Sequence, residues 1–260
     1  MKINFKKIIV YFFIFIFLII SIFPIYYLLV ISSLTFAEFR YSLKPIFIPS
    51  SSKINSIFLA FFQKPYLNSL IISFSVTLIS LCLGIAAGYS FAKYKIGGFI
   101  LPFSILSIRM LPIVAFIIPL FLFSKKLNLI DSYLSIIFSH LIICLPYSIW
   151  MMRAFFKDLP HEIEQAAYMD GCNQWEAFYK ISLPLVAPGI VVTGLFCFIF
   201  SWNEFIFSLV LSRKDVIPIT VALSGGSNYS LALASVIPIL LFSILINKYL
   251  VRGMTLGAIK

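Results

Sequence analysis

The sequence is poor in charged residues and in the side chains that do most enzyme and metal chemistry. Only 11% of its 260 residues are Asp, Glu, Lys or Arg, and it has two histidines and four cysteines. Because soluble domains carry about 25% charged residues, this shortage argues against an ordinary soluble protein. The cysteines show neither a pairing framework nor metal-ligand spacing. We interpret His140 as a packed or hydrogen-bonded residue and His161 as a solvated one, and we expect no metal site.

Signatures of ATP hydrolysis and of catalysis are also missing from the sequence. It contains no G-x-x-x-x-G-K-[ST] phosphate-binding loop, and Gly225-Gly226-Ser227-Asn228 has neither the Lys nor the spacing. An intramembrane enzyme needs paired catalytic groups, and Glu204 and His140 form no recognisable pair in the sequence. We therefore expect no enzymatic activity and no bound cofactor in this chain.

Long apolar segments dominate instead. Apolar residues make up 62% of the chain, against about 45–50% in soluble domains, and six runs approach the ~20 residues that cross a bilayer. They cover approximately residues 8–33, 67–92, 100–123, 133–152, 185–211 and 231–250. Arg109 and three prolines interrupt the third run, so we expect that span to be kinked or broken. The sequence predicts an all-α integral membrane protein with six transmembrane helices in one transmembrane domain, residues 1–260.

The basic residues indicate topology rather than nucleic-acid binding. The net charge is +11, but the Lys and Arg residues are scattered singly between apolar runs instead of clustering on one stripe. The first run is longer than a signal core of about 7–15 residues, and no small-residue cleavage site follows it, so we expect it to remain as an anchor. With both termini in the cytoplasm, eleven Lys and Arg residues lie inside and eight outside, a modest bias of the right sign that favours this orientation only weakly.

One mostly polar stretch, residues 159–188, lies between the fourth and fifth apolar runs. Asp158 and Pro160 favour the start of a short helix, and glutamates in its first turn suit the positive helix end. A small, mildly apolar face follows at i, i+3 and i+4. It is formed by Ile163, Ala166 and Ala167. A partner surface could approach this backbone closely.

The same stretch predicts a second short helix after a break. Gly171 is the expected stop, because it accepts the left-handed conformation that ends a helix. Asn173 with Glu176 three residues later resembles a capping box. Pro184 is expected to end the second helix, because it pushes Leu183 away from helical geometry. The product is a helix–turn–helix elbow over about residues 158–184, whose plainer interpretation is an amphipathic elbow at the membrane surface with no further role.

The residues of this elbow resemble the cytoplasmic "EAA" loop in permease subunits of bacterial ATP-binding-cassette importers. In that loop Glu-Ala-Ala is followed by a helix break at Asp-Gly and later by Leu-Pro. The matching residues are Glu164, Ala166, Ala167, Asp170, Gly171, Leu183, Pro184 and Pro188. Gln165 departs from the pattern, because it separates the Glu from the alanines. The resemblance implies that the first short helix docks on a separate ATPase subunit, with Glu164, Ala166, Ala167, Asp170 and Gly171 as the coupling residues.

Other stretches resemble the carbohydrate-uptake branch of these importers. They are Asn68-Ser69-Leu70, Gly88-Tyr89-Ser90-Phe91-Ala92, Trp202-Asn203-Glu204-Phe205 and the segment from Tyr249 to Ala258. In this order they are similar to the second, six-span permease of maltose-type transporters. The resemblance implies a place in the bacterial cytoplasmic (inner) membrane, a sugar or oligosaccharide as solute, and three partners. These are a second permease, a cytoplasmic ATPase dimer that binds ATP and Mg, and an extracytoplasmic solute-binding protein.

Polar side chains in the fifth apolar run are candidates for a translocation path. Ionisable side chains in spans are costly and usually face a bundle interior or a water-filled path. The candidates are Trp202, Asn203 and Glu204. The alternative is that Glu204 pairs with a polar group of a neighbouring helix. Arg109 has the same ambiguity, with snorkelling to the interface as an added alternative.

Two other transporter classes compete with a sugar importer. One is a permease of the same kind that carries polyamines, phosphate or another small solute. The other is a secondary transporter, which predicts inverted repeats and broken helices that meet at the midplane. We find no repeat in the sequence.

Overall fold

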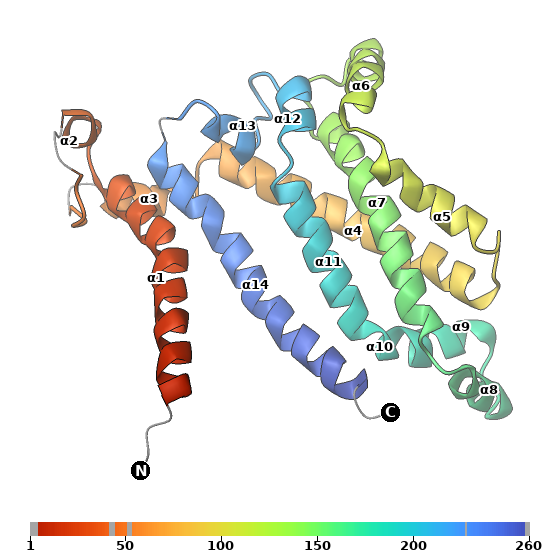
Figure 1. Cartoon of the computed structure of the whole chain (residues 1–260). Helices are drawn as coiled ribbons and strands as arrows, with labels where there is room; N and C mark the ends of the chain where they lie inside the picture. Colours follow the sequence, from red (N-terminus) through yellow and green to blue (C-terminus); the bar gives the residue numbers. More distant parts are fainter. Residues whose placement is uncertain (1–4, 42–44, 51–53, 227, 258–260) are drawn as a thin grey trace.

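Three helices form the centre of the molecule. The computed structural model describes residues 5–41, 45–50, 54–226 and 228–257, and every regular element in these ranges is a helix. At the centre α4 (Lys64–Lys93), α7 (Tyr133–Lys157) and α11 (Ala187–Trp202) pack against one another. Next to α11 lies α14 (Tyr229–Gly257), and α1 (Phe5–Ser33) contacts α14 on its other side (Figure 1).

Two glycines bring α4 and α7 close together. A Cβ atom on Gly84 would lie 2.1 Å from the Ser148 hydroxyl oxygen, and one on Gly88 would lie 2.7 Å from the Arg153 backbone nitrogen. Any larger side chain at these positions would force the helices apart. Small residues spaced four apart allow membrane helices to pack in this way without a hydrophobic driving force.

The third predicted span is two helices joined by a sharp bend. α5 (Ile100–Ser107) continues into a 3₁₀ turn, η2 (Ile108–Met110), and α6 (Val114–Lys126) leaves at 88°. Between them Leu111 has ψ 144°, an extended conformation imposed by the proline that follows it. The expected break is therefore confirmed, and its last helix runs past the predicted end at residue 123.

The fifth predicted span, residues 185–211, is also interrupted, which the sequence did not predict. α11 ends at Trp202, and α12 (Ile206–Leu211) begins only after three non-helical residues. Before α11 the chain turns by 69°, between the helical stretch Gln174–Leu185 and α11. The bend lies at the predicted start of the span, whereas the interruption after Trp202 was not predicted, because apolar residues lie on both sides of Asn203 and Glu204.

Three described helices are long and apolar enough to cross a membrane. They are Ile9–Ser33, Lys64–Lys93 and Tyr133–Lys157, and the number rises to five if each bent pair counts as one span. The start of α14, Tyr229–Leu245, is a shorter apolar helix. The helix of the predicted fourth span extends to Lys157, five residues beyond its predicted end. The count of six spans remains a prediction.

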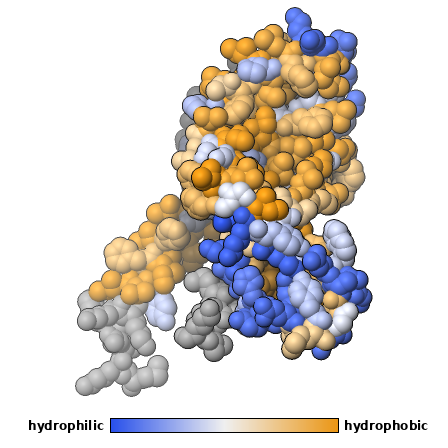
Figure 2. Space-filling model, turned by 90° about the vertical axis from the view of Figure 1, so that its right-hand side faces the viewer, coloured by the Kyte–Doolittle hydropathy of each residue, from blue (hydrophilic) through white to orange (hydrophobic). Residues whose placement is uncertain are grey.

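Short helices lie at the two ends of the bundle. α2 (Phe36–Tyr41), α3 (Ile54–Ala60) and α13 (Ile219–Leu223) lie near one end, whereas the elbow helices α8 (His161–Met169) and α9 (Gln174–Ala177) lie at the other (Figure 1). On the face drawn in Figure 2, apolar side chains cover the middle of the molecule, and hydrophilic side chains gather at the upper end and, over a larger area, at the lower end over the elbow. This distribution is the one expected of a multi-pass membrane protein with a polar loop outside the bilayer.

One carboxylate ties two loops together at the end opposite the elbow. Asp131 accepts hydrogen bonds from four consecutive backbone N–H groups, at distances of 2.8 to 3.1 Å. The donors are Arg213, Lys214, Asp215 and Val216. Partial burial raises the pKa of Asp131, but the four hydrogen bonds outweigh this effect. The pKa is therefore lowered to about 2. The loop before α7 is thereby fixed to the loop after α12.

Candidate functional site

The elbow between α7 and α11 has the predicted break at Gly171. This glycine has φ +88°, in the left-handed region, and a Cβ atom there would meet nothing within 4 Å. Its N–H donates to the Tyr168 carbonyl at 3.1 Å, and the N–H of Cys172 donates to the Ala167 carbonyl at 3.0 Å. This pair of bonds is a Schellman motif, which ends α8 by satisfying its last carbonyls. The predicted helix stop is confirmed.

The second helix of the elbow begins as predicted and ends differently. Asn173 accepts from the Glu176 N–H while Glu176 accepts from the Asn173 N–H, so the capping box is present. The chain then continues through a π turn, η3 (Phe178–Ser182), into α10 (Leu183–Leu185). Leu183 has φ −65° and ψ −45°, so the prediction that Pro184 ends the helix there is wrong. The N–H groups in the first turn of a helical segment have no partner within that segment. Pro184 lies in the first turn of α10, so its missing N–H costs no hydrogen bond there.

The start of α8 also differs from the prediction. Pro160 is the N-cap residue, with ψ 131°, and it makes no side-chain capping bond. Asp158 is the C-cap residue of α7, so it does not cap α8. The negative charge near the helix N-terminus comes instead from Glu162 and Glu164 in the first turn.

The predicted small face of α8 is divided between the inside and the outside of the elbow. Ala167 is 2% exposed and faces the interior, whereas Ile163 and Ala166 are exposed. Gln165 and Met169 are exposed as well. The outward side of α8 is therefore short, weakly apolar and not covered by any described part of the chain.

Glu164 faces inward and joins the elbow to α4. Its carboxylate lies 2.9 Å from the Lys93 ammonium, and both side chains are at least four-fifths buried. It accepts hydrogen bonds from the Tyr89 hydroxyl at 3.2 Å and from the Ser182 hydroxyl of η3. Lys93 also donates to Tyr89 and to Tyr168. One carboxylate therefore connects the end of α4, the first turn of α8 and η3.

The electrostatic environment keeps this carboxylate ionised. Burial alone raises the pKa of Glu164, but the hydrogen bond from Ser182 and the interactions with Lys93 outweigh it, so the pKa lies below the usual value for Glu. The sequence analysis placed Glu164 among the coupling residues without finding these partners. They lie 18 to 75 residues away along the chain, so local sequence patterns could not identify them.

The three path candidates in the fifth span have different surroundings. Trp202 is 2% exposed, packs in the core against Phe198, and donates from Nε1 to the Ser235 carbonyl at 3.2 Å. Asn203 is exposed, and its amide donates only to Ile199 of the preceding turn. Glu204 is 8% exposed. The sequence therefore placed together three residues of which only Asn203 lies on the surface of this chain.

Glu204 caps α12 and pairs with His140 of α7. Its carboxylate accepts the backbone N–H groups of Phe207 at 2.8 Å and Ser208 at 3.0 Å, and it lies 3.1 Å from His140 Nε2. His140 also hydrogen-bonds to the hydroxyls of Ser201 and Ser208. The alternative that Glu204 pairs with a polar group of a neighbouring helix is therefore confirmed, although the sequence did not identify His140 as the partner. The only sequence signal was that both are polar residues in apolar runs.

Arg109 lies at the bend between α5 and α6 against two aromatic rings. Its guanidinium carbon is 4.9 Å from the centre of the Tyr147 ring and 4.1 Å from that of Phe200. Such cation–π contacts hold a positive charge among apolar groups. Among the described residues Arg109 makes no ion pair, and its contacts with the two rings hold the guanidinium in place.

The described residues show no cluster of three or more His, Cys, Asp or Glu side chains that could hold a metal ion. Cys144 of α7 and Cys197 of α11 are buried free thiols, and each points its sulfur at the carbonyl of the other, at 3.6 and 3.7 Å. These two cysteines therefore serve the packing between α7 and α11.

Known proteins resemble the chain over most of its length. Residues 80–255 match a family model described as a binding-protein-dependent transport system inner membrane component. A probable ABC transporter permease, y4oR of Sinorhizobium fredii, is 31% identical over 225 residues, covering 83% of this chain and 81% of that protein. The trehalose transport system permease SugB of Mycobacterium tuberculosis is 32% identical over 212 residues, covering 76% and 77%.

A third relative and one solved structure cover nearly the whole chain. The arabinooligosaccharides transport system permease AraQ of Halalkalibacterium halodurans is 30% identical over 261 residues, covering 93% of this chain and 92% of that protein. A chain of a bacterial ABC transporter involved in the import of the acidic polysaccharide alginate has a TM-score of 0.72 at 23% identity, and it covers 94% of this chain and 96% of that one. At that identity the likeness concerns the fold.

Proposed function

Because the chain belongs to the family of binding-protein-dependent transport system inner membrane components, we propose that it is the permease subunit of an ATP-driven importer for a sugar or oligosaccharide. The names of relatives that carry trehalose and arabinooligosaccharides support this choice of solute. A permease for polyamines, phosphate or another small solute is the alternative. In either case the chain itself forms part of the path and is not the ATPase.

The observation that carries the proposal is the way Glu164 connects the elbow to α4. A partner that moves the elbow must also move the bundle if the transport path is to open. The exposed side of α8, with Ile163 and Ala166, offers a small surface for docking. The buried pair of Glu164 with Lys93 links that surface directly to the end of a membrane-spanning helix. A displacement of α8 is therefore transmitted to α4.

The two ends of the elbow helix have different roles in this proposal. Asp170 and Gly171 form the tight turn that sets the angle between α8 and α9. The Ala167 side chain is buried on the inner side of α8, where a larger side chain would displace the helix outward. In this proposal Ala166 lies on the surface that docks the ATPase, whereas Glu164, Ala167, Asp170 and Gly171 hold that surface in place and couple it to the bundle.

The proposed partners follow from what an importer of this family requires. A second permease completes the path, a cytoplasmic ATPase dimer binds ATP and Mg and docks on the elbow, and an extracytoplasmic protein delivers the solute. We place the chain in the bacterial inner membrane with the elbow and both termini in the cytoplasm. The transmembrane domain then comprises the whole chain, with the six spans that the sequence predicts.

The path residues proposed in the fifth span act at the interruption between α11 and α12. Asn203 is exposed there and is available to contact solute or the second permease. Trp202 and Glu204 are buried beside it and fix the geometry of the interruption. An interrupted helix that exposes polar backbone is tolerated at membrane depth where it lines a cavity or is covered by protein.

The test is to purify the assembled complex through a tag on this chain and reconstitute it in proteoliposomes. The proposal predicts co-purification of an ATPase and a second permease, with ATP hydrolysis stimulated by binding protein loaded with a neutral sugar. Trehalose, maltose and arabinooligosaccharides are the sugars to use, and spermidine and phosphate are the competing solutes. Stimulation by spermidine or phosphate alone would replace sugar by the alternative solute class. A complex that takes up solute without ATP would point to a secondary transporter instead.

A further inference from the structure

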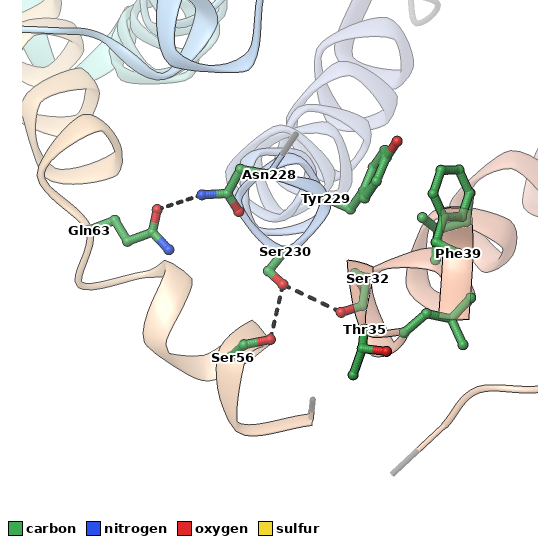
Figure 3. A pocket seen from close by; sticks show the side chains of 10 residues that line it. Ser32, Thr35, Phe39, Ser56, Gln63, Asn228, Tyr229 and Ser230 are labelled. Atoms are coloured by element: carbon green, nitrogen blue, oxygen red, sulfur yellow. Dashed lines mark hydrogen bonds between the residues drawn. The ribbon is translucent and has the colours of Figure 1, made fainter. Parts of the chain in front are cut away.

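A polar cavity lies at the end of the molecule opposite the elbow. It has a volume of about 170 Å³ and lies between the end of α1, α2, α3 and the start of α14. The side chains that define it most clearly are those of Ser32, Phe39, Ser56, Gln63, Tyr229 and Ser230 (Figure 3). The Ser230 hydroxyl donates to the Ser32 carbonyl at 3.4 Å. The end of α1 and the start of α14, which lie almost 200 residues apart in the chain, therefore form one wall of the cavity.

The chemistry of this cavity is neutral and suited to hydroxyl groups. None of the residues that line it is acidic or basic, and the polar groups are hydroxyls and carboxamides. A charged ligand placed there would lose its hydration without gaining an opposite charge, which is costly. A molecule with many hydroxyls can instead bond to the groups of the wall that keep a free donor or lone pair, such as the Gln63 amide nitrogen.

The wall is held in place before any ligand arrives. The Asn228 amide donates to Gln63 Oε1 at 2.9 Å, and the Asn228 carbonyl oxygen accepts from the backbone of Leu231 at 3.0 Å. The amide nitrogen of Gln63 makes no hydrogen bond to the described residues and remains free to donate. On the other side, the rings of Phe39 and Tyr229 lie 5.0 Å apart at 59° (Figure 3). Fixed polar groups beside an apolar ring surface are typical of small-molecule sites.

We propose that this cavity is an entry subsite that binds one neutral sugar unit on the extracytoplasmic side. The inference rests on the proposed function, because the elbow at the opposite end is then cytoplasmic and the cavity faces the side where solute arrives. Its volume is comparable to that of one hexose. In a sugar unit bound there, one hydroxyl oxygen accepts from the Gln63 amide nitrogen, another hydroxyl bonds to the Ser230 hydroxyl, and one face of the ring packs on Tyr229.

The first experiment measures occupancy without transport. In right-side-out vesicles that contain the assembled complex, an impermeant maleimide labels a Ser230→Cys variant, and the wild type gives the background from the native cysteines. Methyl α-glucoside, maltose and trehalose are expected to slow labelling about threefold or more, whereas glucuronate, which adds a carboxylate to the same ring, leaves the rate unchanged. Equal rates with and without all three neutral sugars overturn the proposal, as does equal protection by glucuronate.

The second experiment asks whether occupancy matters for uptake. Ser230→Phe fills the cavity, and Gln63→Met removes the free amide nitrogen together with the acceptor for Asn228 while keeping the side-chain length. Both are expected to raise the half-saturating sugar concentration by about fivefold to tenfold, the effect of one or two lost hydrogen bonds. Ser243→Phe, on the exposed side of the same helix, is the matched control and is expected to behave as the wild type.

The outcomes separate this inference from the proposed function. If the wild-type complex takes up sugar but both cavity variants match it, the entry subsite is wrong and the importer proposal stands. If the wild-type complex takes up no neutral sugar, the proposed solute class is wrong, and the labelling experiment still decides whether the cavity binds sugar.

Discussion

The Lys93 ammonium at the end of α4 lies 2.9 Å from the Glu164 carboxylate in α8. A second ion pair, between Lys180 and Glu176, lies at the surface of the same elbow at 2.8 Å. The first pair joins two helices that are distant in the sequence, whereas the second joins positions i and i+4 of one short segment. Only the first can transmit movement from the elbow to a membrane-spanning helix, and the two pairs therefore provide a matched test of coupling.

Replacing Glu164 by Gln is expected to uncouple the transporter without preventing its assembly. The change leaves Lys93 largely buried without its carboxylate and costs about 1.5–3 kcal/mol of local interaction, because hydrogen bonds to charged groups are the strong ones. The measurement is sugar-stimulated ATP hydrolysis and uptake in the reconstituted complex, together with the amount of co-purified ATPase. We expect stimulation to fall several-fold while ATP hydrolysis without sugar persists.

The control for this prediction is Lys180→Met. Its side chain is 65% exposed, and solvent screening leaves exposed i,i+4 pairs a small contribution, so stimulation should be unchanged. Exchange of the charges, Lys93→Glu with Glu164→Lys, should restore part of the coupling. Normal stimulation in Glu164→Gln would show that the pair has no part in transmission.

Replacing Gly171 by Val is expected to disturb the elbow through the backbone alone. No atom lies within 4 Å of a Cβ at this position, so no clash arises, but φ is +88°. A left-handed conformation costs a residue with a side chain about 1–2 kcal/mol, and Asn tolerates it better than Val. ATPase co-purification and sugar-stimulated hydrolysis should therefore decrease in the order Gly, Asn, Val.

Gly225 provides the comparison for Gly171. It is exposed, a Cβ there also meets nothing within 4 Å, and its φ is not positive. Gly225→Val should therefore keep normal coupling. If both valine variants behave alike, the left-handed turn at Gly171 is not what the ATPase requires.

Local signals in the sequence predicted the elbow well, and non-local contacts escaped them. The stop at Gly171 and the capping box of Asn173 with Glu176 depend on residues within one or two turns, so their chemistry fixes the structure. The break after α5 was also foreseeable, because a proline acts on the residue before it. In contrast, the pairing of Glu204 with His140 depends on how α7 and α11 pack.

The interruption of the fifth span shows the same limit. Apolar residues flank Asn203 and Glu204 on both sides, so the average hydropathy of the run gives one span and does not show that the helix ends there. The described structure ends α11 at Trp202 and starts α12 with Glu204 as the acceptor for its first N–H groups. Glu204 lies three residues before the helical N–H that it accepts, which is a capping signal. The apolar residues around it favour a continuous helix, so this signal did not identify a new helix start.

The stability of the loops opposite the elbow is expected to depend on pH through Asp131. The pKa of this carboxyl is lowered from 3.8 to about 2 in the folded protein. A group with a lowered pKa stabilises the fold above its unfolded pKa, and that contribution is lost as pH falls from about 4 towards about 2. Asp131→Asn should therefore lower the melting temperature of the detergent-solubilised protein at neutral pH, and the difference from wild type should shrink with acidification. Asp170→Asn, in the exposed elbow, is the control, and a pH-independent difference would contradict the assignment.

The proposed orientation can be tested with single cysteines at the two ends of the molecule. Ser224 and Gln174 are both exposed, the first beside α13 and the second in the elbow. In intact cells an impermeant thiol reagent should label Ser224→Cys directly and Gln174→Cys only after permeabilisation. Wild-type cells give the background from Cys172, which lies in the elbow as well. Direct labelling of Gln174→Cys in intact cells would reverse the orientation and place the elbow out of reach of a cytoplasmic ATPase.

Glu204 and Asn203 should separate a structural role from a role in the path. Glu204→Gln keeps one acceptor oxygen but removes the charge opposite His140 and leaves a buried N–H of Phe207 or Ser208 without a good partner, at a cost of about 1–3 kcal/mol. We expect a lower yield and melting temperature of the complex. Asn203→Ala removes an exposed amide that bonds only within its own helix, so yield should be normal and sugar uptake should change. Yield, melting temperature and uptake are measured together at matched expression. Normal yield with altered uptake in Glu204→Gln would instead place the carboxylate itself in the path. If the carboxylate served mainly to cap α12, its loss would lower the stability of the complex.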